Sequence, residues 1–298
     1  MVPSKQTDFE AGNFAAVRIK MTVQRPRSIL IVSSRSDPAS SNIAQALMVR
    51  NGFRQESGQG IESYSKGDIR LVVLEKLGIY AEPSDIPSYV STAIFVSKHV
   101  SSSGRPALTV HATGNLTKEA KFGGNPEEVS QVDPLIIRRT LRALKAGVSQ
   151  AGVQIDITME ATHHGPTNLS MPVCFVEIGS REKEWTDPVL GEIMATAVMA
   201  AAARVKETDP VAAGFGGTHY SAKHTRICME GDYAIGHLVS SHSFDGGVTQ
   251  LVIDDVFNKT TGSCNTAIVD WKGLHSNDRR RLISSLEAAG REIVRCDS

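Results

Sequence analysis

Histidine is the residue type whose placement in this chain most suggests chemistry. Eight of the nine histidines in the 298-residue sequence lie in segments that directly follow apolar, strand-like runs. Imidazole is well suited to metal ligation and to proton transfer near neutral pH. In open α/β sheets, ligands bind outside the carboxyl ends of the strands. Histidines at several strand ends therefore predict one converging site.

The sharpest local signal is the adjacent pair His163 and His164, which follows the apolar run 153–159. On a strand, neighbouring side chains point to opposite faces. Because the Gly-Pro dipeptide at 165–166 ends the run, the backbone turns here and both rings can face one cavity. Glu160 can then supply a carboxylate ligand or a general base. In the alternative interpretation, one histidine caps a turn and the other is hydrogen-bonded in the core.

A glycine-rich segment gives the second signal. Residues 216–224 read Gly-Gly-Thr-His-Tyr-Ser-Ala-Lys-His and follow the apolar run 211–215. Glycine lets the backbone approach a ligand closely, so His219 and His224 can both reach inward. A flexible turn with two surface histidines would have the same sequence, so this segment alone leaves both interpretations open.

Taken together, the strand-end histidines predict a metal site. Zinc prefers histidine nitrogen and carboxylate oxygen, and its catalytic sites keep one position open for water. Because the sequence has no H-E-x-x-H motif, the prediction depends on convergence and not on a spaced signature. The histidines in this set are His111, His163, His164, His219, His224, His237 and His242. The carboxylates that can complete one or two sites are those of Glu160, Glu177 and Glu230.

A basic stripe lies on the helix predicted to begin at 133–134, where an aspartate N-cap precedes a proline. Two further lysines precede this helix, close in sequence to His111 and Asn115. Such a stripe near a site loop can hold RNA phosphates, although a solvated helix face would have the same pattern. The basic residues are Lys118, Lys121, Arg138, Arg139, Arg142 and Lys145.

Strand-like and helix-like runs alternate along the chain. The predicted strands are 28–33, 69–74, 92–97, 107–110, 153–159, 211–215, 233–239, 266–271 and 292–295; the predicted helices are 42–50, 134–145, 189–205, 248–257 and 277–289. This alternation predicts a single α/β domain over 28–298, with a mostly parallel mixed sheet covered by helices on both faces. Residues 1–27 lack clear periodicity and are expected to form an N-terminal tail.

Composition narrows the class further. Lys+Arg and Asp+Glu number 32 each, so a nucleic-acid partner has to be held by a local patch. The four cysteines form no C-x-x-C pair, which fits a reducing compartment. The longest apolar run, 198–203, is shorter than the about 20 residues of a membrane span, and the sequence has no signal-peptide pattern. We therefore expect a cytoplasmic protein that does not associate with membranes.

Other catalytic motifs are missing from the sequence. It contains no G-x-S-x-G elbow, and neither a Walker loop nor a G-x-G-x-x-G loop follows the first predicted strand. These absences disfavour a serine hydrolase, a nucleotide triphosphatase and a dinucleotide oxidoreductase.

Several blocks of the sequence resemble a known family, the D-aminoacyl-tRNA deacylases of the archaeal and plant type. The blocks are 111–115 (His-Ala-Thr-Gly-Asn), 122–124 (Phe-Gly-Gly), 159–166 (Met-Glu-Ala-Thr-His-His-Gly-Pro), 216–220 (Gly-Gly-Thr-His-Tyr) and 236–237 (Gly-His). The resemblance covers nearly the whole chain from about Ser28 onward. It implies an α/β fold similar to nucleoside phosphorylases and peptidyl-tRNA hydrolases, with zinc as the cofactor.

The resemblance also implies an activity, which is hydrolysis of the ester between a D-amino acid and the terminal ribose of tRNA. Plant members are linked in addition to the clearing of aldehyde-modified D-aminoacyl-tRNAs, and the segment before Ser28 favours the plant branch. The partner implied is the acceptor end of D-aminoacyl-tRNA, and no obligate protein partner is inferred.

Under this resemblance, the candidate residues take particular roles. The preferred metal ligands are His163, His164 and His219, and His224 is a further candidate. Glu160 is the next ligand, or it takes the proton of the attacking water, while His111 or Asn115 donates a hydrogen bond to the developing oxyanion. His237 would protonate the departing ribose oxygen. The tRNA acceptor end would lie along Lys118, Lys121, Arg138, Arg139 and Arg142.

Three other functions remain open from the sequence alone. A zinc-dependent peptidase or amidohydrolase would use the same histidines on an amide bond. A non-catalytic tRNA-binding protein needs a charged surface but has no use for so many strand-end histidines. A nucleoside phosphorylase is suggested only by architecture, and a fold does not fix a function.

Overall fold

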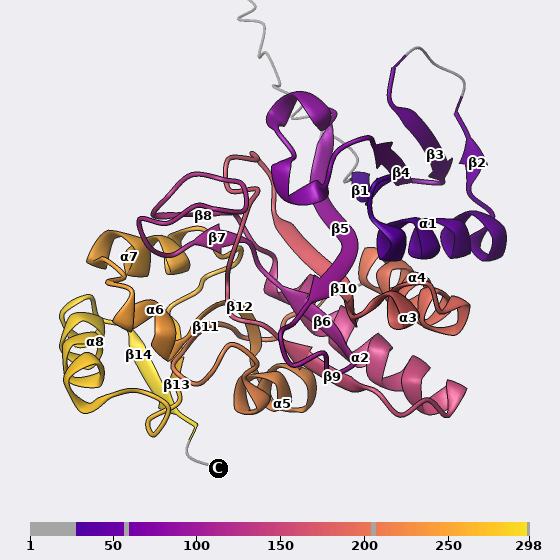
Figure 1. Cartoon of the computed structure of the whole chain (residues 1–298). Coiled ribbons are helices and arrows are strands. Elements are labelled where there is room, and N and C mark those ends of the chain that lie inside the picture. The colour runs from indigo at the N-terminus through magenta and orange to yellow at the C-terminus, as the bar shows by residue number, and fades with distance from the viewer. Residues whose placement is uncertain (1–27, 57–59, 204–206, 297–298) are drawn as a thin grey trace, which may run out of the picture.

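The strands divide into two main sheets that share a layer of helices (Figure 1). The computed structural model describes residues 28–56, 60–203 and 207–296, so the tail expected at 1–27 lies outside the described residues. The predicted α/β class is confirmed, and most strand pairs are parallel. Within these described ranges, no helix has the length and apolar character needed to cross a bilayer.

The larger sheet has eight strands in the order β2-β3-β4-β1-β5-β10-β6-β9. They are β1 (Ser28–Ser34), β2 (Arg54–Gln55), β3 (Glu62–Lys66), β4 (Ile69–Leu74), β5 (Val90–Val100), β6 (Ala107–His111), β9 (Asp156–Met159) and β10 (Val173–Ser180). Strand β6 is antiparallel to β10 but parallel to β9. The carboxyl ends of β6 and β9 therefore lie side by side, with His111 as the last residue of β6 and Glu160 directly after β9.

Strand β10 is a central strand that the sequence pattern did not predict. All eight of its residues are buried. A strand buried on both faces has no alternation of apolar and polar residues, so periodicity gives no signal for it. Its position between β5 and β6 places Glu177 inside the sheet, beside strands that carry His99 and His111.

Three long helices pack on one face of the larger sheet, and each begins with an aspartate N-cap followed by proline. They are α1 (Pro38–Asn51), α2 (Pro134–Ala151) and α4 (Pro188–Ala202). The N-cap carboxylates of Asp37, Asp133 and Asp187 accept hydrogen bonds from backbone N–H groups at 2.8–3.0 Å. Helix α1 was predicted only from 42, whereas its Asp-Pro start places the observed beginning at Pro38.

The opposite face of the larger sheet is covered without long helices. The 3₁₀ turns η1 (Gly78–Tyr80) and η2 (Pro83–Asp85) lie over it, together with Leu169 and Met171. Phe95 and Phe175 stack in this core, with ring centroids 4.8 Å apart. The helix layers thus differ from the expected arrangement, in which helices cover both faces of one sheet.

The second sheet is four-stranded and parallel, in the order β12-β11-β13-β14. Its strands are β11 (Val211–Phe215), β12 (Ala234–Val239), β13 (Thr266–Val269) and β14 (Glu292–Arg295), and the helices that follow them are α5 (Ala222–Glu230), α6 (Ser241–Asp245), α7 (Gln250–Asn258) and α8 (Ser276–Ala288). Alternate residues of β11 belong to two cores: Ala212 packs in the core shared with α2, and Phe215 packs with α7 and α8. Helix α2 therefore lies in a core common to both sheets.

Residues 160–164 connect the two sheets and carry the histidine pair. Thr113, after β6, forms a parallel bridge to His163. On the other side, the Ala161 N–H donates to the carbonyl of His219 and the Thr162 N–H donates to that of Leu238, both at 2.8 Å. Because the segment is paired on both edges, its side chains are held where the two sheets meet.

Candidate active site

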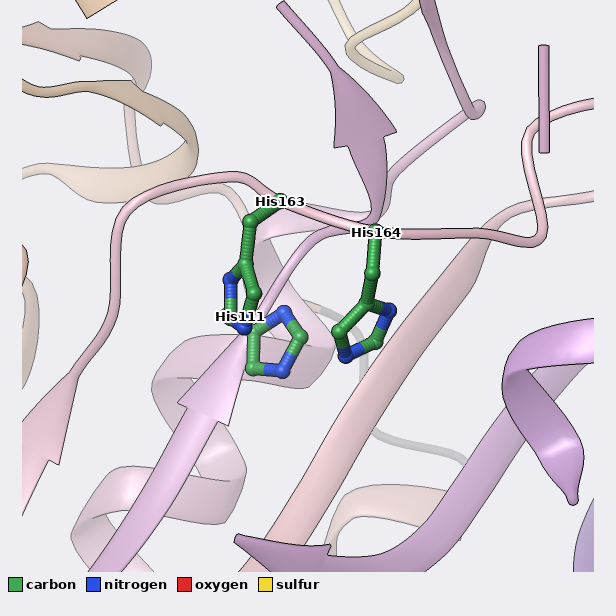
Figure 2. A group of neighbouring side chains, drawn as sticks. All are labelled: His111, His163 and His164. Carbon is green, nitrogen blue, oxygen red and sulfur yellow. The ribbon is translucent and has the colours of Figure 1, made fainter. Parts of the chain in front are cut away.

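Three histidine rings gather at this junction (Figure 2). His111 ends β6, and His163 and His164 lie in the connecting segment. The ring centroid of His111 lies 4.2 Å from that of His163 and 4.9 Å from that of His164, and the adjacent pair is 4.4 Å apart. One ring nitrogen from each of the three lies within 4.8 Å of the others. This spacing suits three ligands of one ion.

The backbone at His164 explains how two consecutive side chains can share a cavity. Its φ is 44°, in the left-handed region that non-glycine residues rarely adopt. The carbonyl of His164 accepts a hydrogen bond of 2.8 Å from the Gly114 N–H, which holds this conformation. The turn brings both rings to one side, where an extended strand would have separated them. Strain of this kind is found preferentially at functional sites.

The hydrogen bonds of the three rings leave one nitrogen of each free to bind an ion. Nδ1 of His111 donates to the carbonyl of Ala112 at 3.1 Å, and those of His163 and His164 donate to the carbonyls of Ala161 and Gly165 at 2.7 Å. Metal-ligating histidines have this pattern, because a backbone carbonyl that accepts from Nδ1 directs the Nε2 lone pair outward. The buried Nε2 of His111 has no hydrogen-bond partner, which supports a ligand role.

Two buried carboxylates complete the cluster. Glu160 accepts a hydrogen bond of 2.9 Å from Nε2 of His219, and the same oxygen lies 3.6 Å from Nε2 of His163. Glu177 lies 3.7 Å from Nε2 of His111. Nδ1 of His99 lies 3.1 Å from Glu160 and 3.5 Å from Glu177.

His99 extends the cluster toward the surface. Its Nδ1 faces the two carboxylates, and its Nε2 lies 2.6 Å from the hydroxyl of Tyr220. Glu177 was among the carboxylates predicted to complete a metal site, whereas His99 was not among the predicted site histidines. His99 lies within the long strand β5, and Glu177 lies on β10, the strand that periodicity missed.

Burial sets the charge of the histidine pair. It lowers the pKa of His163 well below its usual value and lowers that of His164 to about 4. Both rings are therefore neutral near pH 7, as metal ligation requires. Burial by itself would raise the pKa of Glu177, but the imidazoles of His111 and His99, 3.7 Å and 3.5 Å away, outweigh it and hold that pKa well below its usual range. The pKa of Glu160 is also lowered, because the hydrogen bond from His219 outweighs its burial.

Among the described residues, three overlapping groups of side chains could hold a metal ion. They are His111 with His163 and His164, Glu160 with His163 and His219, and His99 with Glu160 and Glu177. The first group offers three nitrogens, and the second offers two nitrogens and one oxygen. Both donor sets are those of catalytic zinc sites that keep a fourth position open.

A cavity of about 840 Å³ adjoins the histidine pair. Its size is in the range of about 300–1,000 Å³ that is typical of small-molecule sites. His163 and His164 line it, together with Asn115, Lys118 and Phe122 from the segment after β6. A ligand in this cavity would lie against His163 and His164, whereas His111 is buried behind the lining.

Two predicted histidines lie elsewhere, as buried structural groups. His224 lies on α5 and not in a loop; its ring nitrogens bond to the hydroxyl of Ser221 at 2.6 Å and the carbonyl of Ile268 at 3.0 Å. His237, on β12, bonds to the carbonyl of Ser130 at 3.0 Å and to the hydroxyl of Thr162 at 3.2 Å. Neither ring belongs to a potential metal-binding group among the described residues. Both ring nitrogens of each histidine are hydrogen-bonded, which disfavours the ligand role predicted for His224 and the donor role predicted for His237.

The predicted RNA-binding arginines of α2 also have a structural role. Arg138 is buried and donates to the backbone carbonyls of Gly231 and Asp232, next to β12. Arg139 donates to the carbonyls of Leu135 and Ala203, and Arg142 donates to that of Met229. These arginines tie α2 to neighbouring segments, which favours a structural role for them over the predicted contact with RNA phosphates.

Asn115 lines the cavity, and its hydrogen bonds favour a role in holding the adjacent loop over the predicted oxyanion contact. Its Nδ2 donates to the carbonyl of Gly123 at 2.8 Å and to that of Asn125 at 3.1 Å. Both of its N–H groups are therefore already engaged.

Fold and cluster together define the class: an α/β protein with a histidine-carboxylate centre, of the kind that metal-dependent hydrolases use. A sequence model of the family described as D-aminoacyl-tRNA deacylase matches residues 87–294. This chain belongs to the D-aminoacyl-tRNA deacylase family, as its sequence blocks suggested.

Individual relatives agree with this assignment. The D-aminoacyl-tRNA deacylase of Aeropyrum pernix is 35% identical over 279 residues, covering 89% of this chain and 98% of the relative. That of Methanocaldococcus jannaschii is 35% identical over 275 residues, with the same coverage of 89% and 98%. The crystal structure of a conserved protein of unknown function has a TM-score of 0.83 at 29% identity, over 91% of this chain and 96% of that one.

Proposed function

We propose that this chain hydrolyses the ester bond of D-aminoacyl-tRNA and releases a free D-amino acid and tRNA. The observation that supports this most directly is the convergence of His111, His163 and His164, each with its Nε2 free, beside a cavity of about 840 Å³. The proposal includes a cytoplasmic location and extends to aldehyde-modified D-aminoacyl-tRNAs, which present the same ester.

We assign zinc to this centre, with His111, His163 and His164 as its ligands. Glu160 and His219 lie next to this set through His163 and can hold a second ion or act as acid and base. Bound zinc acts as a Lewis acid and makes water a better nucleophile near neutral pH. In this assignment His111 is a ligand, in place of the oxyanion role expected for it.

We assign the proton transfers of the reaction to Glu160 and His219. Glu160 has a lowered pKa, so it is ionised near pH 7 and can accept a proton from water. His219 is hydrogen-bonded to Glu160, and 42% of its side chain is exposed, so it can reach a substrate. It therefore replaces His237 as the proposed donor to the departing ribose oxygen.

The sugar-phosphate backbone of the tRNA would contact the loop that follows β6. Lys118 and Lys121 are exposed and line the cavity, in contrast to the arginines of α2. Discrimination between D and L requires simultaneous placement of the amino group, the carbonyl and the side chain, so that one enantiomer clashes or leaves a buried polar group unpaired.

A comparison of substrates tests the proposal. Purified protein loaded with zinc is incubated with D-tyrosyl-tRNA, L-tyrosyl-tRNA, an N-acyl-D-tyrosine and a short peptide, and release of each product is measured. Selective hydrolysis of D-tyrosyl-tRNA supports the proposal. Faster cleavage of the amides would favour a zinc peptidase or amidohydrolase instead.

A further inference from the structure

Phe122 is an aromatic side chain exposed beside the candidate active site. It is 61% exposed, whereas the other six phenylalanines of the described residues are at most 8% exposed. Exposing a large apolar side chain forgoes about 1.5–3 kcal/mol of burial free energy. Its ring borders the same cavity as His163 and His164. An exposed aromatic at this position suggests that a ligand covers it.

The loop around Phe122 is held rigidly. The carbonyl of Phe122 accepts a hydrogen bond of 3.0 Å from the N–H of Gly165, the residue after His164. Gly123 has a φ of 77°, and a Cβ there would lie 1.9 Å from the carbonyl oxygen of Ile79. Only glycine fits this position, and Asn115 fixes it further by donating to the Gly123 carbonyl. The position of Phe122 is thus tied to the histidine pair before any ligand binds.

Cationic side chains accompany the exposed ring. Lys118 and Lys121 line the same cavity. Lys121 pairs with Glu119 at 2.9 Å, while no ion pair of Lys118 occurs in the described ranges. Sites that bind unpaired nucleotides combine aromatic rings, on which bases stack, with lysines that hold phosphates. This loop has both components next to a hydrolytic centre.

We infer that Phe122 is a stacking platform for the terminal adenine of the unpaired 3′ end of tRNA. This inference rests on the proposed function, because the ester of that substrate is carried by the terminal ribose. With the ester at the histidine cluster, the base attached to the same sugar has to lie within the adjoining cavity. Stacking suits an enzyme that acts on many tRNAs, since every tRNA ends in the same nucleotide.

Kinetics of Phe122 variants test this inference. We expect Phe122→Leu to raise KM for D-tyrosyl-tRNA about tenfold, since stacking of one base contributes about 1–3 kcal/mol. Phe122→Trp keeps an aromatic face and should stay within about threefold of the unchanged protein. The decisive quantity is the ratio of kcat/KM for D-tyrosyl-tRNA to that for D-tyrosine methyl ester, which has no base. We expect Phe122→Leu to lower this ratio about tenfold.

A remote aromatic residue provides the matched control. Tyr89→Leu also removes an exposed ring, at the start of β5 and away from the cavity, and should leave the ratio unchanged. An equal loss on both substrates in Phe122→Leu would mean that Phe122 supports the site's structure, and it would overturn the inference. An unchanged KM for the tRNA would overturn it as well.

Binding of the trinucleotide CCA separates this inference from the proposed function. A calorimetric titration of the zinc-loaded protein with CCA measures binding of the bases without any turnover. One outcome is that D-tyrosyl-tRNA is not hydrolysed, while CCA binds and Phe122→Leu weakens that binding about tenfold. In that case the proposed activity is wrong, but the inferred stacking site is supported. If Phe122→Leu binds CCA as well as the unchanged protein does, the stacking site is wrong.

Discussion

At the scale of single residues, burial decides which histidines can do chemistry. His163, His164 and His237 all have pKa values lowered by burial. The first two keep a free Nε2 beside a cavity, whereas both nitrogens of His237 are hydrogen-bonded in the core. The same residue type is therefore available as a metal ligand in one place and is a structural group in another.

Removal of one proposed ligand should abolish both metal binding and activity. His164→Ala is expected to lower turnover by more than about 100-fold, since loss of even an outer contact to a metal ligand reduces affinity or activity by about 10–100-fold. Bound zinc, measured by atomic absorption, should fall in parallel. His275→Ala, at an exposed histidine before α8, is the control and should keep both. Normal zinc content in His164→Ala would remove this residue from the centre.

Acid should destabilise the fold through His237, whose pKa burial lowers to about 4. Between about pH 6.5 and pH 4 the unfolded chain binds a proton that the folded chain does not, so stability falls as pH falls through this window. The loss from this one group reaches about 3 kcal/mol at pH 4. Urea unfolding gives the free energy of unfolding at each pH. We expect its slope against pH to differ between the unchanged protein and His237→Gln by the amount that corresponds to about one proton. An NMR titration of His237 near pH 6.5 would contradict the prediction.

At the scale of elements, the basic residues of α2 and those of the loop after β6 lie in different surroundings. Arg138 on α2 is buried against the backbone that leads into β12, and its guanidinium lies 3.4 Å from Asp209. The loop lysines are exposed and border the cavity. Their sequence spacing does not reveal this difference, which depends on what packs against each element.

Arg138 should matter for stability and not for RNA binding. Arg138→Leu leaves two carbonyls without their donor and should lower the free energy of unfolding by about 3 kcal/mol. Arg142→Leu, at an exposed neighbour with one carbonyl contact, should lower it by less than about 1 kcal/mol. Urea denaturation measures both. Equal effects of the two substitutions would contradict this assignment.

The loop lysines should account for the salt dependence of tRNA binding. Replacing Lys118 and Lys121 by alanine together should weaken binding and reduce the slope of log affinity against log salt by about 1.4, or about 0.7 per single-strand phosphate contact. Filter binding over a range of salt concentrations measures the slope. Lys66→Ala, at an exposed lysine ending β3, should leave the slope unchanged. An unchanged slope in the double variant would place the RNA elsewhere.

At the scale of the whole molecule, the proposed metal centre links the two sheets. His111 ends a strand of the larger sheet, His163 and His164 lie between the sheets, and His219 follows a strand of the second sheet. An ion at this junction stabilises the folded chain as a unit, because its ligands are brought together only when both sheets are formed.

Metal removal should therefore lower the melting temperature. We expect protein dialysed against a chelator to melt at least about 5 °C below protein with excess zinc, since a ligand at 1,000 times its Kd contributes about 4 kcal/mol. Scanning calorimetry measures the shift. Magnesium, which prefers oxygen ligands, should not restore it. Identical melting temperatures with and without zinc would argue against a structural link through the ion.

Local patterns in the sequence determined much of the scaffold. The strand 211–215 was predicted at its observed limits, and Asp-Pro marked the start of α2 and α4, because capping and periodicity act over a few residues. The turn at 165–166 likewise indicated that His163 and His164 could share a cavity. These features depend on neighbours in the chain, which the sequence displays directly.

Only the tertiary structure decided the membership of the site. The central position of β10 places Glu177 beside His111 and His99. Because residues 222–230 form α5, His224 is buried in the core and does not lie with His219 in the site. Contacts between segments far apart in the chain likewise placed Arg138 and His237 in structural roles. Burial and hydrogen bonds from distant segments determine the charge of a side chain and which of its atoms remain free to bind a ligand. The spacing of residues in the sequence does not reveal these contacts.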